Sequence, residues 1–156
     1  MKTELILVGR TADRHFEAGI RDYTGRIAHY MPFDITVIPE LRNTKSLTEE
    51  QQKVAEGELI LKMVQPSDTV VLLDEHGRDF RSVEFARWLE QKRNTARRLL
   101  FVVGGPYGFS PAVYARANEK ISLSRMTFSH QMVRLIFTEQ LYRACTIIRG
   151  EPYHHE

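Results

Sequence analysis

The sequence is poor in cysteine, and its hydrophobic stretches are short. Cys145 is the one cysteine in 156 residues, so no disulfide can form within the chain, and we expect an inert buried thiol in a reducing compartment. The longest apolar runs, Thr69–Leu73 and Leu99–Val103, are far too short to cross a bilayer. Met1 leads into a strand pattern without the residues of an export signal. We therefore expect a soluble, cytoplasmic protein.

Two nucleotide-binding signatures are also missing. The dinucleotide fingerprint needs Gly-x-Gly-x-x-Gly and an acidic residue about 20 positions later. The glycines here are Gly104, Gly105 and Gly108, and the later position holds Ser124 and Arg125. No Gly-Lys-Ser or Gly-Lys-Thr follows the glycines, which argues against a phosphate-binding P-loop and nucleotide hydrolysis.

An excess of charge is nearly absent, because 22 basic and 20 acidic side chains leave a formal net charge of +2. The distribution is uneven: residues 1–75 carry 9 basic and 13 acidic side chains, whereas residues 76–156 carry 13 and 7. Two interpretations stay open, an ordinary solvated surface and a phosphate-facing surface that attracts nucleic acid. The second would use Arg93, Arg97, Arg98, Arg116, Lys120, Arg125, Arg134, Arg143 and Arg149.

The pattern that is present alternates short apolar runs with helical periodicity, in a length typical of a single domain over residues 1–156. Such alternation predicts an α/β fold, with a mostly parallel sheet and helices on both faces. The expected strands are 5–8, 35–38, 69–74, 99–103 and 121–123. The expected helices are 16–27, 48–64, 82–92 capped by Ser82, 111–117, and 130–149 ended by Gly150 and Pro152.

Glycines follow the fourth of these strands. Leu99–Val103 continues into Gly104-Gly105-Pro106-Tyr107-Gly108, and Ser110-Pro111 then predicts a capped helix start. Taken alone, the glycine pattern also fits a plain turn. In a parallel sheet, however, the loops at the carboxyl ends of the strands converge and form the ligand site. We therefore expect an adenosine or methionine moiety to bind where three loops meet, namely residues 73–77, 104–108 and 123–128.

The last predicted helix is apolar on several faces, with Leu135, Phe137, Leu141 and Ile148 among its residues. A helix of this kind must be buried on more than one side. In a small domain, one of those sides is expected to form a subunit interface, which predicts a homodimer. The alternative is a central core helix in a monomer.

Two pairs of residues near this helix are candidates for chemistry. His130 and Arg134 share a helix face, so Arg134 could hold a phosphate or a base carbonyl while His130 relays a proton. A capping histidine and a solvated arginine fit the same spacing. Tyr153 and His154 could stack on and hydrogen-bond a nucleobase, or belong to a disordered terminus. The adjacent His154 and His155 lack partners at zinc-like spacing, so we expect no metal site.

Taken together, these residues resemble the SPOUT-class RNA methyltransferases, and within that class the family that methylates N3 of a pseudouridine in 23S rRNA. The resemblance covers the whole chain. One departure is Ser129, where members often have proline, although serine can still cap the following helix. The resemblance is carried by Val8-Gly9, Leu72-Leu73-Asp74 with Gly77, Gly104-Gly105-Pro106 with Gly108, Leu123-Ser124 with Met126-Thr127, His130 with Arg134, Glu139 with Leu141-Tyr142-Arg143-Ala144, and Pro152-Tyr153-His154.

The resemblance implies a deep trefoil knot, the SPOUT or alpha-beta knot, in the C-terminal third of the chain. It implies an obligate homodimer in which Tyr153 and His154 of one subunit help to complete the partner's site. It also implies an S-adenosylmethionine site. The residues expected there are Leu73, Gly104, Gly105, Gly108, Leu123, Ser124, Arg125, Met126, Thr127 and Phe128.

The implied reaction is methylation of the pseudouridine at N3 within the assembled ribosome. Methyl transfer from a sulfonium depends mainly on positioning. The N3 proton must leave during the attack, so His130, His154 or solvent is expected to take it, and Arg134 to stabilise the developing negative oxygen. Two rival classes stay open: a non-enzymatic ribosome-binding factor, which needs no pocket, and a nucleotide-dependent enzyme with a conventional open sheet.

Overall fold

The computed structural model describes all 156 residues and contains a five-stranded sheet. Its strands are β1 (Lys2–Val8), β2 (Phe33–Ile38), β3 (Thr69–Asp79), β4 (Arg98–Val103) and β5 (Glu119–Ser122). The strand order is β2-β1-β4-β3-β5, and every neighbouring pair is parallel. The predicted α/β fold with a mostly parallel sheet is therefore confirmed.

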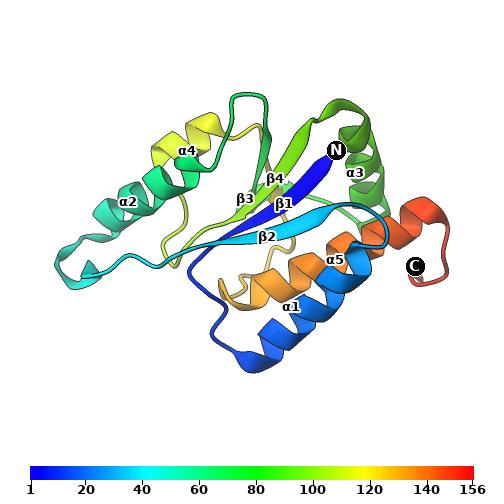
Figure 1. The fold of residues 1–156 in the computed structure, drawn as a ribbon, viewed down its shortest axis with the longest axis horizontal. Helices are drawn as coiled ribbons and strands as arrows, with labels where there is room; N and C mark the ends of the chain where they lie inside the picture. Colours follow the sequence, from blue (N-terminus) through cyan, green and yellow to red (C-terminus); the bar gives the residue numbers. More distant parts are fainter.

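Helices lie on both faces of this sheet, as predicted (Figure 1). They are α1 (Arg14–Ile27), α2 (Glu49–Lys62), α3 (Ser82–Thr95), α4 (Pro111–Arg116) and α5 (Met132–Arg149), with a short 3-10 turn η1 at Thr44–Ser46. α2 and α4 cover one face, whereas α1, α3 and α5 cover the other. None of the helices has the length and apolar character that a membrane span requires.

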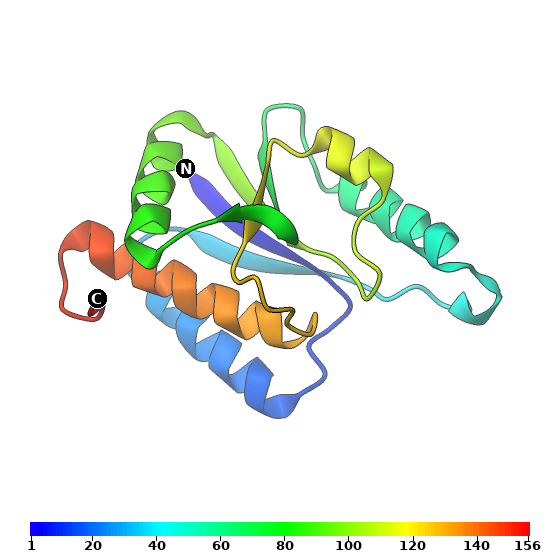
Figure 2. The ribbon, with the colours of Figure 1, turned by 180° about the vertical axis from the view of Figure 1, so that it is seen from behind.

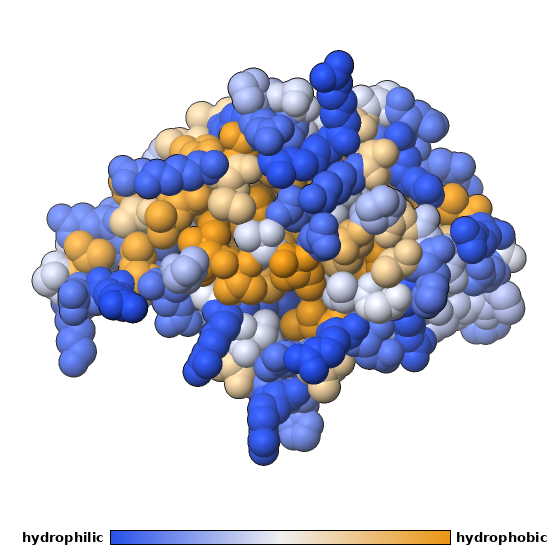
Figure 3. All heavy atoms as spheres, in the orientation of Figure 1, coloured by the Kyte–Doolittle hydropathy of each residue, from blue (hydrophilic) through white to orange (hydrophobic).

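Alternating side chains of the central strands supply two hydrophobic cores. In β1, Leu5 and Leu7 pack among side chains of α1, α3 and α5, whereas Ile6 and Val8 pack toward α2 and α4. This division follows from the two-residue period of a strand. At the edge strand β2 the cover is thinner: hydrophobic residues reach the surface around β2 and α2 (Figure 3), where Val37 is 44% exposed.

The helices begin at side-chain caps in most cases. The Ser110 hydroxyl accepts a 3.3 Å hydrogen bond from the N–H of Val113, and a proline occupies the first turn of α4, as predicted. The predicted cap of α3 is wrong, because Arg81 holds the cap position. The Ser82 hydroxyl is instead 3.0 Å from Oε1 of Gln140 on α5. Ser82 therefore joins two helices.

α5 begins at Met132, two positions later than predicted. The cap position belongs to Gln131, which makes no capping bond, so Ser129 is not the cap residue; its hydroxyl accepts a 3.0 Å hydrogen bond from the N–H of Met132 and still supports the start of the helix. Gly150 ends the helix in a left-handed conformation, with φ of 74°. Cys145 lies within it and is 2% exposed, and burial raises the pKa of its thiol to about 11. The prediction of a buried thiol is confirmed.

β3 extends beyond the predicted residue 74 and is interrupted beside β5. Leu73 and Arg78 both pair with Ile121, so residues 74–77 leave the ladder. A Cβ added at Gly77 would lie 2.6 Å from the backbone nitrogen of Ile121, so only glycine allows this contact between the two backbones. Figure 2 shows the end of β3 crossing β5.

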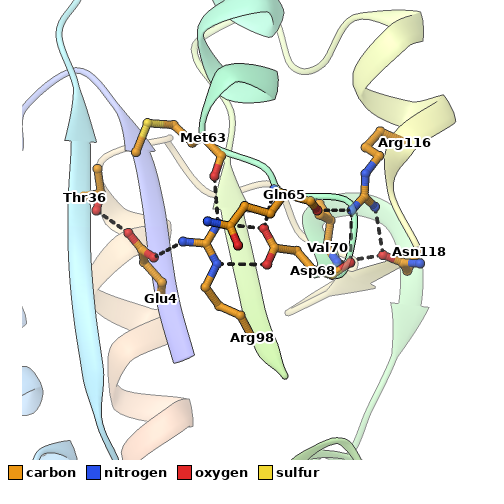
Figure 4. Close-up of polar contacts among 9 residues, drawn as sticks. All are labelled: Glu4, Thr36, Met63, Gln65, Asp68, Val70, Arg98, Arg116 and Asn118. Atoms are coloured by element: carbon orange, nitrogen blue, oxygen red, sulfur yellow. Dashed lines mark hydrogen bonds and ion pairs between the residues drawn. The ribbon is translucent and has the colours of Figure 1, made fainter. Parts of the chain in front are cut away.

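A polar network ties the amino-terminal ends of the strands together (Figure 4). Arg98 of β4 donates to the two carboxylate oxygens of Asp68, at 2.9 and 2.6 Å, and to the carbonyl of Met63 at 2.8 Å. Its guanidinium also lies 3.3 Å from the carboxylate of Glu4. Burial opposes ionisation of Asp68, but the hydrogen bonds from Arg98 hold its pKa below the ordinary value. These charged groups at this end of the sheet are therefore paired with one another inside the fold.

Four of the nine basic residues considered for a nucleic-acid surface are buried or half-buried and bind partners inside the fold. Arg98 belongs to this network, Arg116 donates to backbone carbonyls of the loop before β3, Arg143 pairs with Glu139, and Arg134 is wholly buried. The interpretation that all nine residues form one continuous nucleic-acid surface is therefore wrong. The exposed members are Arg93, Arg97, Lys120, Arg125 and Arg149.

Candidate functional site

A cavity of about 520 Å³ opens at the carboxyl ends of β3 and β4 and beside the segment that follows β5. These three strands are neighbours in the sheet, so the three predicted loops meet at one place. Nine of the ten residues expected at a cofactor site line this cavity: Leu73, Gly104, Gly105, Gly108, Leu123, Ser124, Met126, Thr127 and Phe128.

The loop at residues 104–108 has little room for side chains. A Cβ added at Gly104 would lie 3.2 Å from the Phe109 ring and 3.3 Å from the Gly108 carbonyl oxygen. Gly108 has φ of +84°, which L side chains rarely adopt, and its N–H donates to the Gly105 carbonyl at 3.2 Å. The glycines therefore hold a tight turn whose backbone borders the cavity.

Hydrogen bonds shape the segment after β5. The Ser122 hydroxyl donates to the carbonyl of Ser124 at 2.7 Å, and the Ser124 hydroxyl accepts from the N–H of Met126 at 2.9 Å. The Thr127 hydroxyl donates to Glu75 at 2.7 Å, which ties this segment to the loop after β3. The backbone N–H groups of Thr127 and Phe128 donate to no acceptor in the chain. They are available to a ligand.

Arg125 is the expected cofactor residue that does not line the cavity. Its side chain is 90% exposed, and its Nε lies 3.2 Å from Asp79 at the end of β3. It therefore projects from the rim of the site into solvent.

Acidic and aromatic residues complete the rim. Asp74 and Glu75 line the cavity, and the Tyr114 hydroxyl of α4 donates to the Asp74 carboxylate. Burial, followed by this contact with Asp74, raises the pKa of Tyr114 to about 12. The sequence did not predict that Tyr114 belongs to the site. Its position one helical turn after the Ser110 cap, on the helix that follows the glycine loop, is the signal that could have indicated it.

His130 lines the cavity, and Arg134 does not. Burial, with the nearby charge of Arg134, lowers the pKa of His130 below its ordinary value, so the neutral imidazole is favoured. The Arg134 guanidinium donates to the carbonyls of Val8 and Gly9 at 2.8 Å and of His130 at 2.9 Å, and to the Thr11 hydroxyl at 3.1 Å. Four of its five N–H groups are thereby occupied. Arg134 therefore supports the segment that carries His130.

Tyr153 and His154 lie at the other end of α5 (Figure 1), about 27 Å away along an 18-residue helix. The Tyr153 hydroxyl donates to Glu139 at 3.0 Å, and Nδ1 of His154 lies 3.1 Å from Nη1 of Arg143. Burial, then contacts with neighbouring polar groups that include Glu139, raises the pKa of Tyr153. The fold of one subunit thus does not bring the tail together with His130.

The site offers a roomy cavity with backbone donors, acidic groups at its rim and two histidines, His76 and His130, of which His130 is the one whose neutral form is favoured by burial. Its volume falls in the range of roughly 300–1,000 Å³ typical of small-molecule sites. No group of three His, Cys, Asp or Glu residues is arranged to hold a metal ion. The arrangement suits binding of a cofactor-sized molecule that carries positive charge, beside a group that accepts a proton.

A family model described as "Predicted SPOUT methyltransferase" matches residues 1–154. The chain belongs to the SPOUT methyltransferase family. Over the full length of both chains, it is 65% identical to the ribosomal RNA large subunit methyltransferase H of Bacteroides fragilis. It is 62% identical to the proteins of the same name from Phocaeicola vulgatus and Bacteroides thetaiotaomicron, again over both full chains.

Membership of the SPOUT methyltransferase family makes this chain a methyltransferase, which excludes the two rival classes, a non-enzymatic factor and a nucleotide-dependent enzyme. The matched range includes every residue that lines the cavity, as well as Tyr153 and His154. The cavity at the carboxyl ends of β3 and β4 is thus the candidate site of methyl transfer in this SPOUT methyltransferase.

Proposed function

We propose that this methyltransferase moves a methyl group from S-adenosylmethionine to N3 of a pseudouridine in large-subunit ribosomal RNA, with the assembled ribosome as substrate. The observation that carries the proposal is the cavity built from three loops, in a chain 65% identical to a named ribosomal RNA large subunit methyltransferase H. Because the ribosome is a cytoplasmic particle, the proposal places the reaction in the cytoplasm.

The residues around the cavity fit S-adenosylmethionine. When bound, this molecule supplies an electrophilic methyl group on a positively charged sulfonium. Asp74 and Glu75 place negative charge at the rim, which favours a cationic ligand. The tight turn at Gly104 lets the backbone come close to a ligand, and the free N–H groups of Thr127 and Phe128 can donate to its polar atoms.

His130 is the proposed proton acceptor. Nitrogen N3 of the base must lose its proton as the new bond to the methyl carbon forms and the carbon–sulfur bond breaks. The lowered pKa of His130 keeps its imidazole neutral and able to take that proton. Arg134 acts as a positioning residue, because it donates to the His130 carbonyl and lies outside the cavity.

The proposal includes a homodimer. Along its outer side α5 carries Val133, Ile136, Gln140 and Arg143, which stay partly exposed in the subunit and follow one another at helical spacing. Val133 also lines the cavity, so a partner on this side would border the site. A dimer of this kind would let Tyr153 and His154 of one subunit reach the site of the other.

We also propose that the whole of residues 1–156 forms one domain with a deep trefoil knot at its C-terminal side. Support comes from the crossing of β3 over β5, where Gly77 lies against the Ile121 backbone (Figure 2). Such close contact is expected where one segment is threaded past another.

The direct test incubates the purified protein with methyl-labelled S-adenosylmethionine and ribosomes that lack the modification. We expect label at N3 of one pseudouridine in the large-subunit RNA. Ribosomes that already carry the methyl group serve as the matched control and should take up none. Donor binding without label would retain the methyl-donor site and refute this substrate, whereas a lack of donor binding would refute the whole proposal.

A further inference from the structure

A buried carboxyl group lies beneath the glycine loop and has no place in the reaction described so far. Glu56 of α2 is 5% exposed, and its Oε2 accepts a 3.3 Å hydrogen bond from the side chain of Gln52. Its Oε1 is buried and has no hydrogen-bond partner. Buried polar atoms are nearly always paired, so an orphaned acceptor at this position calls for a reason.

The carboxyl group of Glu56 lies directly against the loop. A Cβ added at Gly105 would lie 2.6 Å from Oε1 and 2.7 Å from Oε2 of Glu56. The next residue of α2 makes a second close contact, because a Cβ added at Gly57 would collide with the Ser110 hydroxyl. α2 therefore packs against both ends of the segment 105–110, which runs from the glycine loop to the cap of α4.

The charge around this carboxyl group does not explain its burial. No arginine or lysine pairs with Glu56, whereas the buried Asp68 has Arg98 as its partner. Burial raises the pKa of Glu56, the hydrogen bond from Gln52 opposes this, and the nearby Glu40 adds to it. The side chain is thus kept at a location that is unfavourable for a carboxyl group and adjacent to the loop that lines the cavity.

We propose that Glu56 is a positioning residue for the methyl-donor site. Its Oε1 accepts a hydrogen bond from a backbone N–H of the loop at residues 104–108 as the loop settles around the bound donor. The inference rests on the proposed binding of S-adenosylmethionine to this loop. Glu56 touches the loop from below and does not line the cavity, so it acts through the backbone of Gly105.

The test compares three variants with the wild-type protein by calorimetric titration with S-adenosylmethionine. Glu56→Leu keeps a side chain of similar size and removes the acceptor, so the Kd is expected to rise about tenfold, the scale of one hydrogen bond. Glu56→Gln retains an acceptor oxygen and should restore the Kd to within about threefold of wild type. Glu58→Gln changes an exposed carboxylate on the same helix and should leave the Kd unchanged.

Kinetics separate positioning from a merely structural role. In Glu56→Leu, the KM for the donor should rise by the same factor as the Kd, while kcat at saturating donor stays within about threefold of wild type. If Glu56→Leu binds the donor as tightly as wild type, the inference is overturned. A fall in kcat with an unchanged donor KM would overturn it as well. If the wild-type protein binds no donor, the failure belongs to the proposed function.

A measurement on the wild-type protein covers the case in which Glu56→Leu does not fold. The carboxyl carbon of Glu56 can be followed by carbon-13 NMR as the donor is added, with Glu58 as the internal reference. A new hydrogen bond at Oε1 should shift the Glu56 signal and leave that of Glu58 in place. A Glu56 signal that stays unchanged at saturation would refute the role.

Discussion

The Arg134 guanidinium donates a 2.8 Å hydrogen bond to the carbonyl of Gly9, 125 residues earlier in the chain. Together with its contacts to Val8 and Thr11, this bond fastens the start of α5 to the loop that follows β1. Nε of the same guanidinium donates a 2.9 Å hydrogen bond to the His130 carbonyl. The position of the candidate proton acceptor therefore depends on a loop from the opposite end of the sequence.

This arrangement predicts that Arg134→Ala loses stability first. Removal of the guanidinium leaves buried carbonyl groups without donors, so the free energy of unfolding should fall by about 3 kcal/mol. Urea unfolding measures the change. Arg21→Ala, which alters an exposed arginine of α1, should stay within about 0.5 kcal/mol of wild type. An Arg134→Ala protein of unchanged stability but without activity would instead indicate that Arg134 contacts the substrate.

His130→Asn is expected to lower kcat by about 100-fold while donor binding stays close to that of wild type, because a proton acceptor contributes on this scale. Calorimetry with S-adenosylmethionine and single-turnover methylation measure the two effects. Full turnover in His130→Asn would show that another group, namely His154, solvent or the second cavity histidine His76, accepts the proton.

The acidic limb of the wild-type pH profile gives a second, independent measurement on His130. Only the neutral imidazole accepts a proton, and burial lowers the pKa at which His130 becomes charged. Activity should therefore persist as the pH falls through the ordinary histidine range and decline only below it. A decline at or above the ordinary histidine pKa would contradict this assignment.

The sequence could predict the place of the site because that place follows from short-range patterns. Short continuous apolar runs, typical of strands buried on both faces, identify β3 and β4, and the glycines at 104–108 follow β4 directly. Parallel strands then require their carboxyl ends to meet. Each of the three loops predicted on this ground, at 73–77, 104–108 and 123–128, contributes residues that line the cavity.

Partners that are distant in the sequence could not be predicted in this way. Helical spacing places His130 and Arg134 on one face but does not reveal that the carbonyl of Gly9 occupies the space beside Arg134. The same holds for Tyr114, which meets Asp74 across 40 positions of the chain. Such pairings depend on the packing of whole elements, and single-sequence periodicity contains no information on it.

Arg125→Glu should separate the two roles that Arg125 can have. Its side chain is exposed at the rim and contacts Asp79, so we expect unchanged donor binding and weaker binding to ribosomes, by about tenfold at low salt. Sedimentation with ribosomes at several salt concentrations measures the loss, which should shrink as salt rises. Arg21→Glu, an exposed arginine on α1 outside the basic half of the sequence, is the control. If Arg125→Glu weakens donor binding instead, Arg125 belongs to the cofactor site after all.

Complementation between two inactive subunits tests whether the tail acts across the dimer. Tyr153 and His154 lie far from His130 within one subunit, at the opposite end of α5. A heterodimer of a His130→Asn subunit and a His154→Ala subunit then contains one site with both histidines and one site with neither. We expect each variant homodimer to be nearly inactive and the purified heterodimer to regain about half of the wild-type activity. If the two histidines served the same subunit, every site of the heterodimer would lack one of them, and its activity would stay at the level of the homodimers.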